Sequence, residues 1–233
     1  MDVEWKLRAV AGCFMLGISA VPSHAAIIFD SGAPNQSDSR LDDRGTAFFD
    51  LAQPFTLIAG ASTVTDAHWW GNCANPDSPP GPFITSCSGN DSFDVSIFSD
   101  SGGLPGAPIA TLLTNGNANR TATGQNILTS FTEYEYSISF APVALAPGTP
   151  YWFEISNQAA VGAWFMEGFS SPGSGSAFRS TGSAGAWVPF ANQTFNLQLT
   201  NDGVNNGVPE PATLGLLASG LAGLAFSRRR RLK

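Results

Sequence analysis

The sequence predicts an all-β fold, an antiparallel β-sandwich of jelly-roll or Greek-key type, with one helix expected outside the sandwich at each end. Glycine and proline are abundant, at 25 and 16 of 233 residues, and only 12% of residues are charged. Such a composition contains too few charged side chains for the solvent-exposed faces of long helices. Short segments alternate apolar and polar residues with a period of two. Turns rich in Gly and Pro, rather than amphipathic helices, separate these segments.

The expected strands follow one another at short intervals. They cover residues 26–29, 46–51, 63–69, 93–97, 109–112, 133–140, 151–156, 163–169, 177–179 and 194–199. Because no helix is expected between them, these short strands should pair antiparallel. Strong turn signals lie at 101–106 and 146–150. The mixture of short and long connections favours a jelly-roll or Greek-key order over a simple meander.

The alternation also predicts which side chains enter the core. In 133–140 the inward side chains are Tyr134, Tyr136, Ile138 and Phe140, and the outward ones are Glu133, Glu135, Ser137 and Ser139. In the last two clear strands the inward side chains are Tyr151, Phe153 and Ile155, and Phe195, Leu197 and Leu199. Each strand thus has one apolar face, as expected in a sandwich.

The predicted domain, residues 26–203, is strongly acidic. It holds 15 of the 18 acidic residues and four of the 11 basic ones, which gives a formal charge of −11, and it contains no lysine. Such a surface repels phosphate backbones, so we expect no nucleic-acid partner. The length suits one domain with a sizeable core.

Residues 1–25 are predicted to be a signal peptide that forms the N-terminal signal helix. Lys6 and Arg8 precede an apolar stretch over 9–21, and a small-x-small site ends at Ala25. We expect export and cleavage after Ala25. Cys13 lies inside the apolar stretch rather than at the cleavage point, which argues against a lipoprotein.

Residues 204–233 form a linker and a tail in three parts. Pro209, Glu210 and Pro211 come first, an apolar run over 213–226 follows, and a basic cluster ends the chain. Prolines on both sides of one carboxylate make a stiff, extended segment. The run, expected to be a C-terminal hydrophobic helix, would reach about 21 Å, short of the ~30 Å hydrocarbon core. The basic cluster should stay cytoplasmic.

This three-part order resembles the PEP-CTERM sorting signal, which is recognised by exosortase. The resemblance implies that Pro209, Glu210 and Pro211 are the recognition motif. It also implies transient anchoring in the inner membrane of a Gram-negative bacterium, then release to the cell envelope or extracellular matrix. The alternative is an ordinary tail anchor. Segments 93–113 and 145–153 are similar to sandwich ectodomains found ahead of such anchors, a resemblance that implies no catalytic residues.

Cys73 and Cys87 are the only cysteines of the predicted domain, 14 residues apart in sequence rich in Pro, Gly and Ser. In an exported protein this pattern predicts a disulfide. Closing a loop of this size stabilises by about 3 kcal/mol in the chain-entropy model. The alternative is a pair of free or metal-binding thiols, with His68 nearby.

Candidates for catalysis are few. His68 could pair with Asp66 and orient a serine such as Ser99, but no Gly-x-Ser-x-Gly elbow accompanies them. Glu133 and Glu135 would lie about 7 Å apart on one strand face. A glycosidase, however, needs its carboxylates on opposite sides of the substrate. We therefore predict no catalytic residue and no enzymatic activity.

Two binding hypotheses stay open. Tryptophans could stack on sugars, and Trp152 and Trp70 are the best candidates because Trp152 alternates out of phase with the core positions of its strand. The sequence predicts no cofactor and no defined metal site, although structural calcium remains an option. The aspartates that could hold it are Asp30, Asp38, Asp42 and Asp43, and separately Asp91, Asp94 and Asp100.

The sequence thus predicts a non-enzymatic structural or surface protein of the cell envelope or extracellular matrix. The first alternative is a module that binds carbohydrate, namely exopolysaccharide. A hydrolase is the second alternative.

Overall fold

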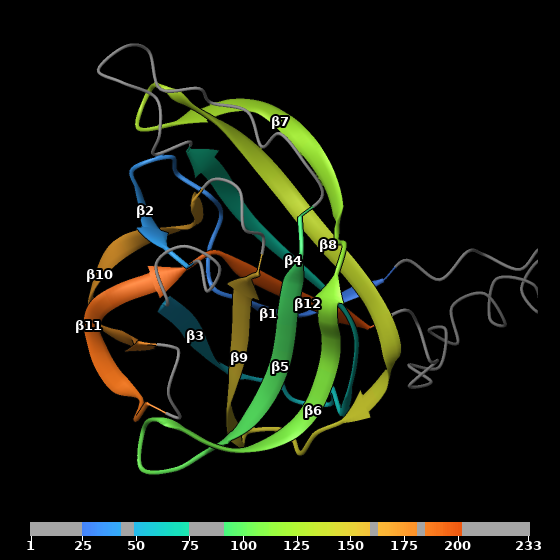
Figure 1. Cartoon of the computed structure of the whole chain (residues 1–233). Coiled ribbons are helices and arrows are strands. Elements are labelled where there is room, and N and C mark those ends of the chain that lie inside the picture. Colours follow the sequence, from blue (N-terminus) through green and yellow to red (C-terminus); the bar gives the residue numbers. More distant parts are fainter. Residues whose placement is uncertain (1–24, 43–48, 75–90, 159–162, 181–184, 202–233) are drawn as a thin grey trace, which may run out of the picture.

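The computed structural model describes residues 25–42, 49–74, 91–158, 163–180 and 185–201 (Figure 1). Twelve strands and no helix occur in these ranges. They are β1 (Ala26–Asp30), β2 (Asp38–Leu41), β3 (Phe49–Thr56), β4 (Thr63–Ala74), β5 (Phe93–Asp100), β6 (Pro105–Gly116), β7 (Asn119–Ile127), β8 (Phe131–Ala144), β9 (Pro150–Asn157), β10 (Ala163–Ser180), β11 (Val188–Phe195) and β12 (Leu197–Asn201).

All the strand pairs are antiparallel and belong to one hydrogen-bonded sheet that folds into two layers. The first layer has the order β1-β12-β4-β8-β7, and the second has the order β10-β3-β9-β5-β6. Neighbours such as β12 and β4, or β3 and β9, are far apart in sequence. Crossovers of this kind fit a sandwich of the predicted type and exclude a simple meander.

The long strand β10 joins the two layers. Its first residues pair with β4, its last residues pair with β3, and β2 and β11 pair with its middle. Figure 1 shows β10 and β11 curving around one side of the molecule, while β7 and β8 curve over the other. A strand this long can serve both layers because it bends along its length.

An aromatic cluster fills the space between the layers. The ring of Phe93 in β5 lies 5.4 Å from Trp69 of β4, 5.2 Å from Tyr136 of β8 and 5.2 Å from Trp164 of β10, all edge-on. Since β5 and β4 share no hydrogen bonds, these contacts are the packing of one layer on the other. Edge-to-face pairs contribute about 0.5–1.5 kcal/mol beyond the area that they bury.

The structure confirms the all-β prediction and most of the predicted strand positions. Tyr136 and Ile138 are buried as expected, and so are the inward residues of 151–156 and 194–199. The segment 194–199 is not one strand, because Asn196 separates β11 from β12. The predicted strands 163–169 and 177–179 are two parts of β10. The strands β2 and β7 were not predicted.

The two flanking helices were expected in residues 1–25 and 204–233, which lie outside the described residues apart from Ala25. Among the residues that the structure describes, none lies in a helix long and apolar enough to cross a membrane.

Candidate functional site

A groove of about 540 Å³ lies on the outer face of the second layer, over β9, β5 and β6. Strand alternation places it there. Val95 and Ile97 of β5 are fully buried in the core, so the side chains between and beside them face the other way. The residues lining the groove are Asp94, Ser96, Phe98, Gly106, Pro108, Thr111, Thr114, Glu154, Arg179 and Trp187.

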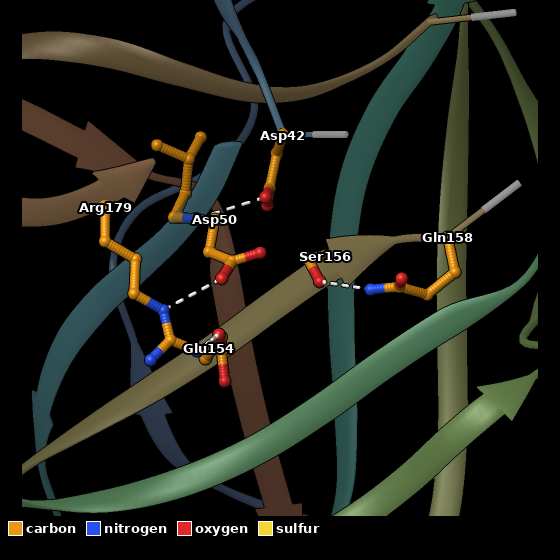
Figure 2. Close-up of polar contacts among 7 residues, drawn as sticks. Asp42, Asp50, Glu154, Ser156, Gln158 and Arg179 are labelled. Carbon is orange, nitrogen blue, oxygen red and sulfur yellow. Dashed lines mark hydrogen bonds and ion pairs between the residues drawn. The ribbon is translucent and has the colours of Figure 1, made fainter. Parts of the chain in front are cut away.

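A charged network centred on Arg179 borders the groove. The Arg179 Nε donates to Asp50 Oδ2 at 2.8 Å, and Nη2 donates to Glu154 Oε1 at 2.7 Å (Figure 2). Arg179 pairs directly with Asp50 in the ladder between β10 and β3. Asp50 is fully buried and Glu154 is 3% exposed. The attraction of the guanidinium therefore offsets the free-energy cost of removing two carboxylates from water.

Trp187 forms the aromatic wall of the groove. The guanidinium carbon of Arg179 lies 4.5 Å from the centroid of the Trp187 ring, and the Phe98 ring meets it edge-on at 6.1 Å. The first contact is a cation–π interaction. Together these two contacts fix the plane of an indole ring that keeps part of its surface exposed.

The predicted stacking residues lie elsewhere. Trp152 is only 4% exposed, because it packs with Phe98 and Trp187, and its Nε1 donates to Asp100 Oδ1 at 2.8 Å. Its ring is therefore not available for stacking, which corrects the sequence-based choice. Trp70 remains partly exposed on β4 in the first layer. It cannot share a surface with Trp187 of the second layer.

The residues considered for a catalytic triad are not brought together. His68 Nδ1 lies 2.8 Å from Glu135 Oε1 on the outer face of the first layer. Asp66 instead accepts a hydrogen bond from the Thr65 hydroxyl at 2.7 Å. Ser99 belongs to β5 in the second layer, where its hydroxyl donates to the carbonyl of Ala107.

Of the two glutamates of 133–140, only Glu133 differs from the prediction. Glu135 is partly exposed, but Glu133 is 1% exposed. Glu133 Oε2 accepts a bond from Gln36 Nε2 at 2.6 Å, and Glu133 is also hydrogen-bonded to the fully buried Glu167. The loop before β2 covers this position, so strand alternation alone could not place Glu133.

Glu167 and Glu133 form a buried pair of carboxyl groups. Burial first, and then the hydrogen bond to Glu133, raise the pKa of Glu167 to about 8, although the backbone N–H groups of Gln36 and Asn35 oppose the shift. Those N–H groups donate to Glu167 Oε1 at 2.8 and 3.0 Å. At neutral pH Glu167 therefore keeps its proton.

The aspartates considered for calcium serve separate local roles. Asp38 pairs with Arg40, and Asp42 accepts the backbone N–H of Leu51. Asp91 pairs with Arg120 at 2.9 Å, and burial raises the pKa of Asp91 while Arg120 lowers it. Asp30, Asp94 and Asp100 each accept a hydrogen bond from a nearby backbone N–H group. The donors are Gly32, Asn115 and Gly103, respectively. Asp43 lies outside the described residues. Within the described ranges, no group of three or more metal-binding side chains occurs.

Cys73 lies at the end of β4, where it pairs with Trp164 of β10 and is 8% exposed. Its predicted partner, Cys87, lies outside the described residues, as do Pro209, Glu210 and Pro211. The Cys73–Cys87 disulfide therefore remains a prediction at this point.

Sequence reasoning missed Arg179 and Glu167 as site residues. Each lies in β10 beside residues from distant strands, so local sequence gives little signal. Arg179 is one of only four basic residues in 26–203. The rarity of arginine in so acidic a domain was the one sequence signal that Arg179 would have carboxylate partners.

The comparisons with known proteins concern the end of the chain. Residues 207–231 match the family model of the PEP-CTERM protein-sorting motif. No curated protein and no solved structure matches the chain. The matched range includes the Pro-Glu-Pro residues, the apolar run and the four arginines of the basic cluster. The chain therefore carries a PEP-CTERM sorting motif, which marks it as an exported protein that exosortase sorts to the cell envelope.

Proposed function

We propose that the protein is a non-catalytic β-sandwich, displayed at the cell envelope or in the extracellular matrix after exosortase has processed its tail. The match of residues 207–231 to the sorting motif carries this proposal. The separation of His68 from Ser99, and the burial of Glu133, support a role without catalysis. The sandwich is the part that remains once both targeting segments are removed.

The proposal includes the finer steps of maturation. Signal peptidase cleaves after Ala25, the hydrophobic run then holds the chain in the inner membrane of a Gram-negative bacterium, and exosortase releases it. Cys73 and Cys87 form a disulfide in the oxidising compartment. This bond fastens the segment after β4 to the sandwich.

The intact mass of protein recovered from the envelope and the medium tests this proposal. We expect a chain that starts at Ala26, has lost the segment after the Pro-Glu-Pro residues and is lighter by two hydrogens. Glu210→Ala should leave the tail uncut, whereas Asn206→Ala, just outside the matched range, should be processed normally. Recovery of Glu210→Ala in the processed form would contradict the proposal.

A second candidate function, binding of exopolysaccharide, is favoured by the groove on the second layer. It combines an aromatic wall with polar side chains in about 540 Å³, within the ~300–1,000 Å³ of typical ligand sites. Such a module would keep the released protein in the matrix. Structural calcium stays a separate option, which calcium-dependent melting would reveal.

A further inference from the structure

The groove offers two kinds of contact. Trp187 and Phe98 provide apolar surface at one end. Ser96, Thr111 and Thr114 also line the groove, and no side-chain hydrogen bond of these three residues occurs within the described part of the chain. A hydroxyl can both donate and accept, so the three suit a ligand that carries many hydroxyl groups.

The aromatic wall is rigid before any ligand arrives. Trp187 is held between the Arg179 guanidinium and the edge of Phe98, and Arg179 is itself fixed by two buried carboxylates. A ring whose position is already fixed loses little entropy when a ligand packs against it. The apolar C–H face of a sugar is a surface that such a ring can accept.

The charge of the groove selects against anions. Asp94 and Glu154 line it, and the buried Asp50 is paired with Arg179, which is the only cation among the lining residues. The surrounding domain carries −11. An anionic sugar would meet this field without a cation to pair with, because Arg179 already contacts two carboxylates.

We propose that this groove binds a neutral sugar unit of an uncharged polysaccharide. The sugar packs against Trp187 and exchanges hydrogen bonds with Ser96, Thr111 and Thr114. This inference rests on the second candidate function and specifies it. Uronate-rich polymers, which are anionic, are expected not to bind in this groove.

Retention of the processed protein in native gels that contain a polysaccharide tests the inference. The neutral probes are dextran, mannan, galactan and xylan, and the anionic probes are alginate and polygalacturonate. We expect retardation by at least one neutral polymer and by neither anionic one. Retardation by none of the neutral polymers, or stronger retardation by alginate, would overturn the inference.

Matched variants locate the site. Trp187→Ala should weaken retention at least tenfold, whereas Trp70→Ala, a partly exposed tryptophan on the other layer, should leave it unchanged. Thr111→Val keeps the shape and the strand preference of an exposed side chain and should weaken retention several-fold. Unchanged binding in both Trp187→Ala and Thr111→Val, or loss in Trp70→Ala, would refute this placement.

The same samples separate this inference from the sorting proposal. Intact mass reports processing, and gel retention reports binding. Groove variants should be processed like the wild type. Normal processing without retention would remove the sugar site and leave the sorting proposal in place.

Discussion

Glu167 shows how one buried side chain can make the whole fold sensitive to pH. Its folded pKa of about 8 lies above its ordinary value of 4.5. The unfolded chain releases this proton from about pH 4.5 upward, while the folded protein keeps it. The stabilisation is thus complete below pH 4.5 and is lost as pH rises to about 8, with a slope of at most about 1.4 kcal/mol per pH unit.

The variant Glu167→Gln should remove this slope. An amide can accept the N–H groups of Asn35 and Gln36 and donate to Glu133 without holding a titrating proton. We expect the variant to match the wild type near pH 5 and to exceed it by about 1–3 kcal/mol at pH 8, measured by urea unfolding. Asp30→Asn, at an exposed turn, should keep the wild-type slope. A variant that is less stable than the wild type at pH 8 would contradict the raised pKa of Glu167.

The candidate site also shows where residue-level prediction stops. Trp152 alternates out of phase with Tyr151, Phe153 and Ile155, but alternation cannot show that Leu104 and Trp187 pack over it. The exposed ring belongs to Trp187, 35 residues further along the chain. Arg179 orients that ring through contacts that exist only after β10, β3 and β9 have assembled.

At the scale of elements, β10 depends on glycines where it passes close to other strands. A Cβ added to Gly168 would collide with the carbonyl oxygen of Thr194 and lie 2.9 Å from Gln193 Nε2, whereas a Cβ at Gly175 would meet nothing within 4 Å. Both glycines belong to the same strand. They therefore form a matched pair for substitution.

Gly168→Ala should destabilise the protein by about 1–3 kcal/mol, because backbone cannot move aside as a flexible side chain can. Gly175→Ala should be neutral, or stabilising by up to about 1 kcal/mol, since alanine restricts the unfolded chain. Thermal unfolding of both variants measures the difference. Equal melting temperatures would contradict this prediction, because they would show that β10 and β11 can move apart at Gly168 without a loss of stability.

The predicted elements succeeded where alternation was uninterrupted. In β8 and β9 one face is apolar over several residues, so period two was sufficient to predict that these segments are strands, although it did not predict the burial of Glu133 or Trp152. In β10 the segment between the two predicted strands is Ser-Ser-Pro-Gly-Ser-Gly-Ser, which resembles a loop. Pairing with β11 makes this segment continuous strand through a register shift between Ser170 and Gly175, and a sequence window cannot detect that partner.

At the scale of the whole molecule, the number of amino groups in the protein reports on the proposed maturation. Lys6 and Lys233 are the only lysines, and each lies in a segment that maturation would remove. The mature chain should therefore carry one amine, the α-amino group of Ala26. Complete acetylation of the denatured native protein, followed by intact mass, should add one acetyl group. Three would show an unprocessed chain, and two would show that one targeting segment remains.

The sequence by itself determined the targeting signals and the fold class of this protein. Export, the Pro-Glu-Pro motif and the all-β pattern are local properties, because targeting enzymes read short linear segments and strand faces repeat every two residues. Only the tertiary structure decided that Glu133 is buried against Glu167, that Trp152 is covered, and that Trp187 and Arg179 border the groove. Each of these depends on contacts between strands far apart in sequence, and no local periodicity encodes such contacts.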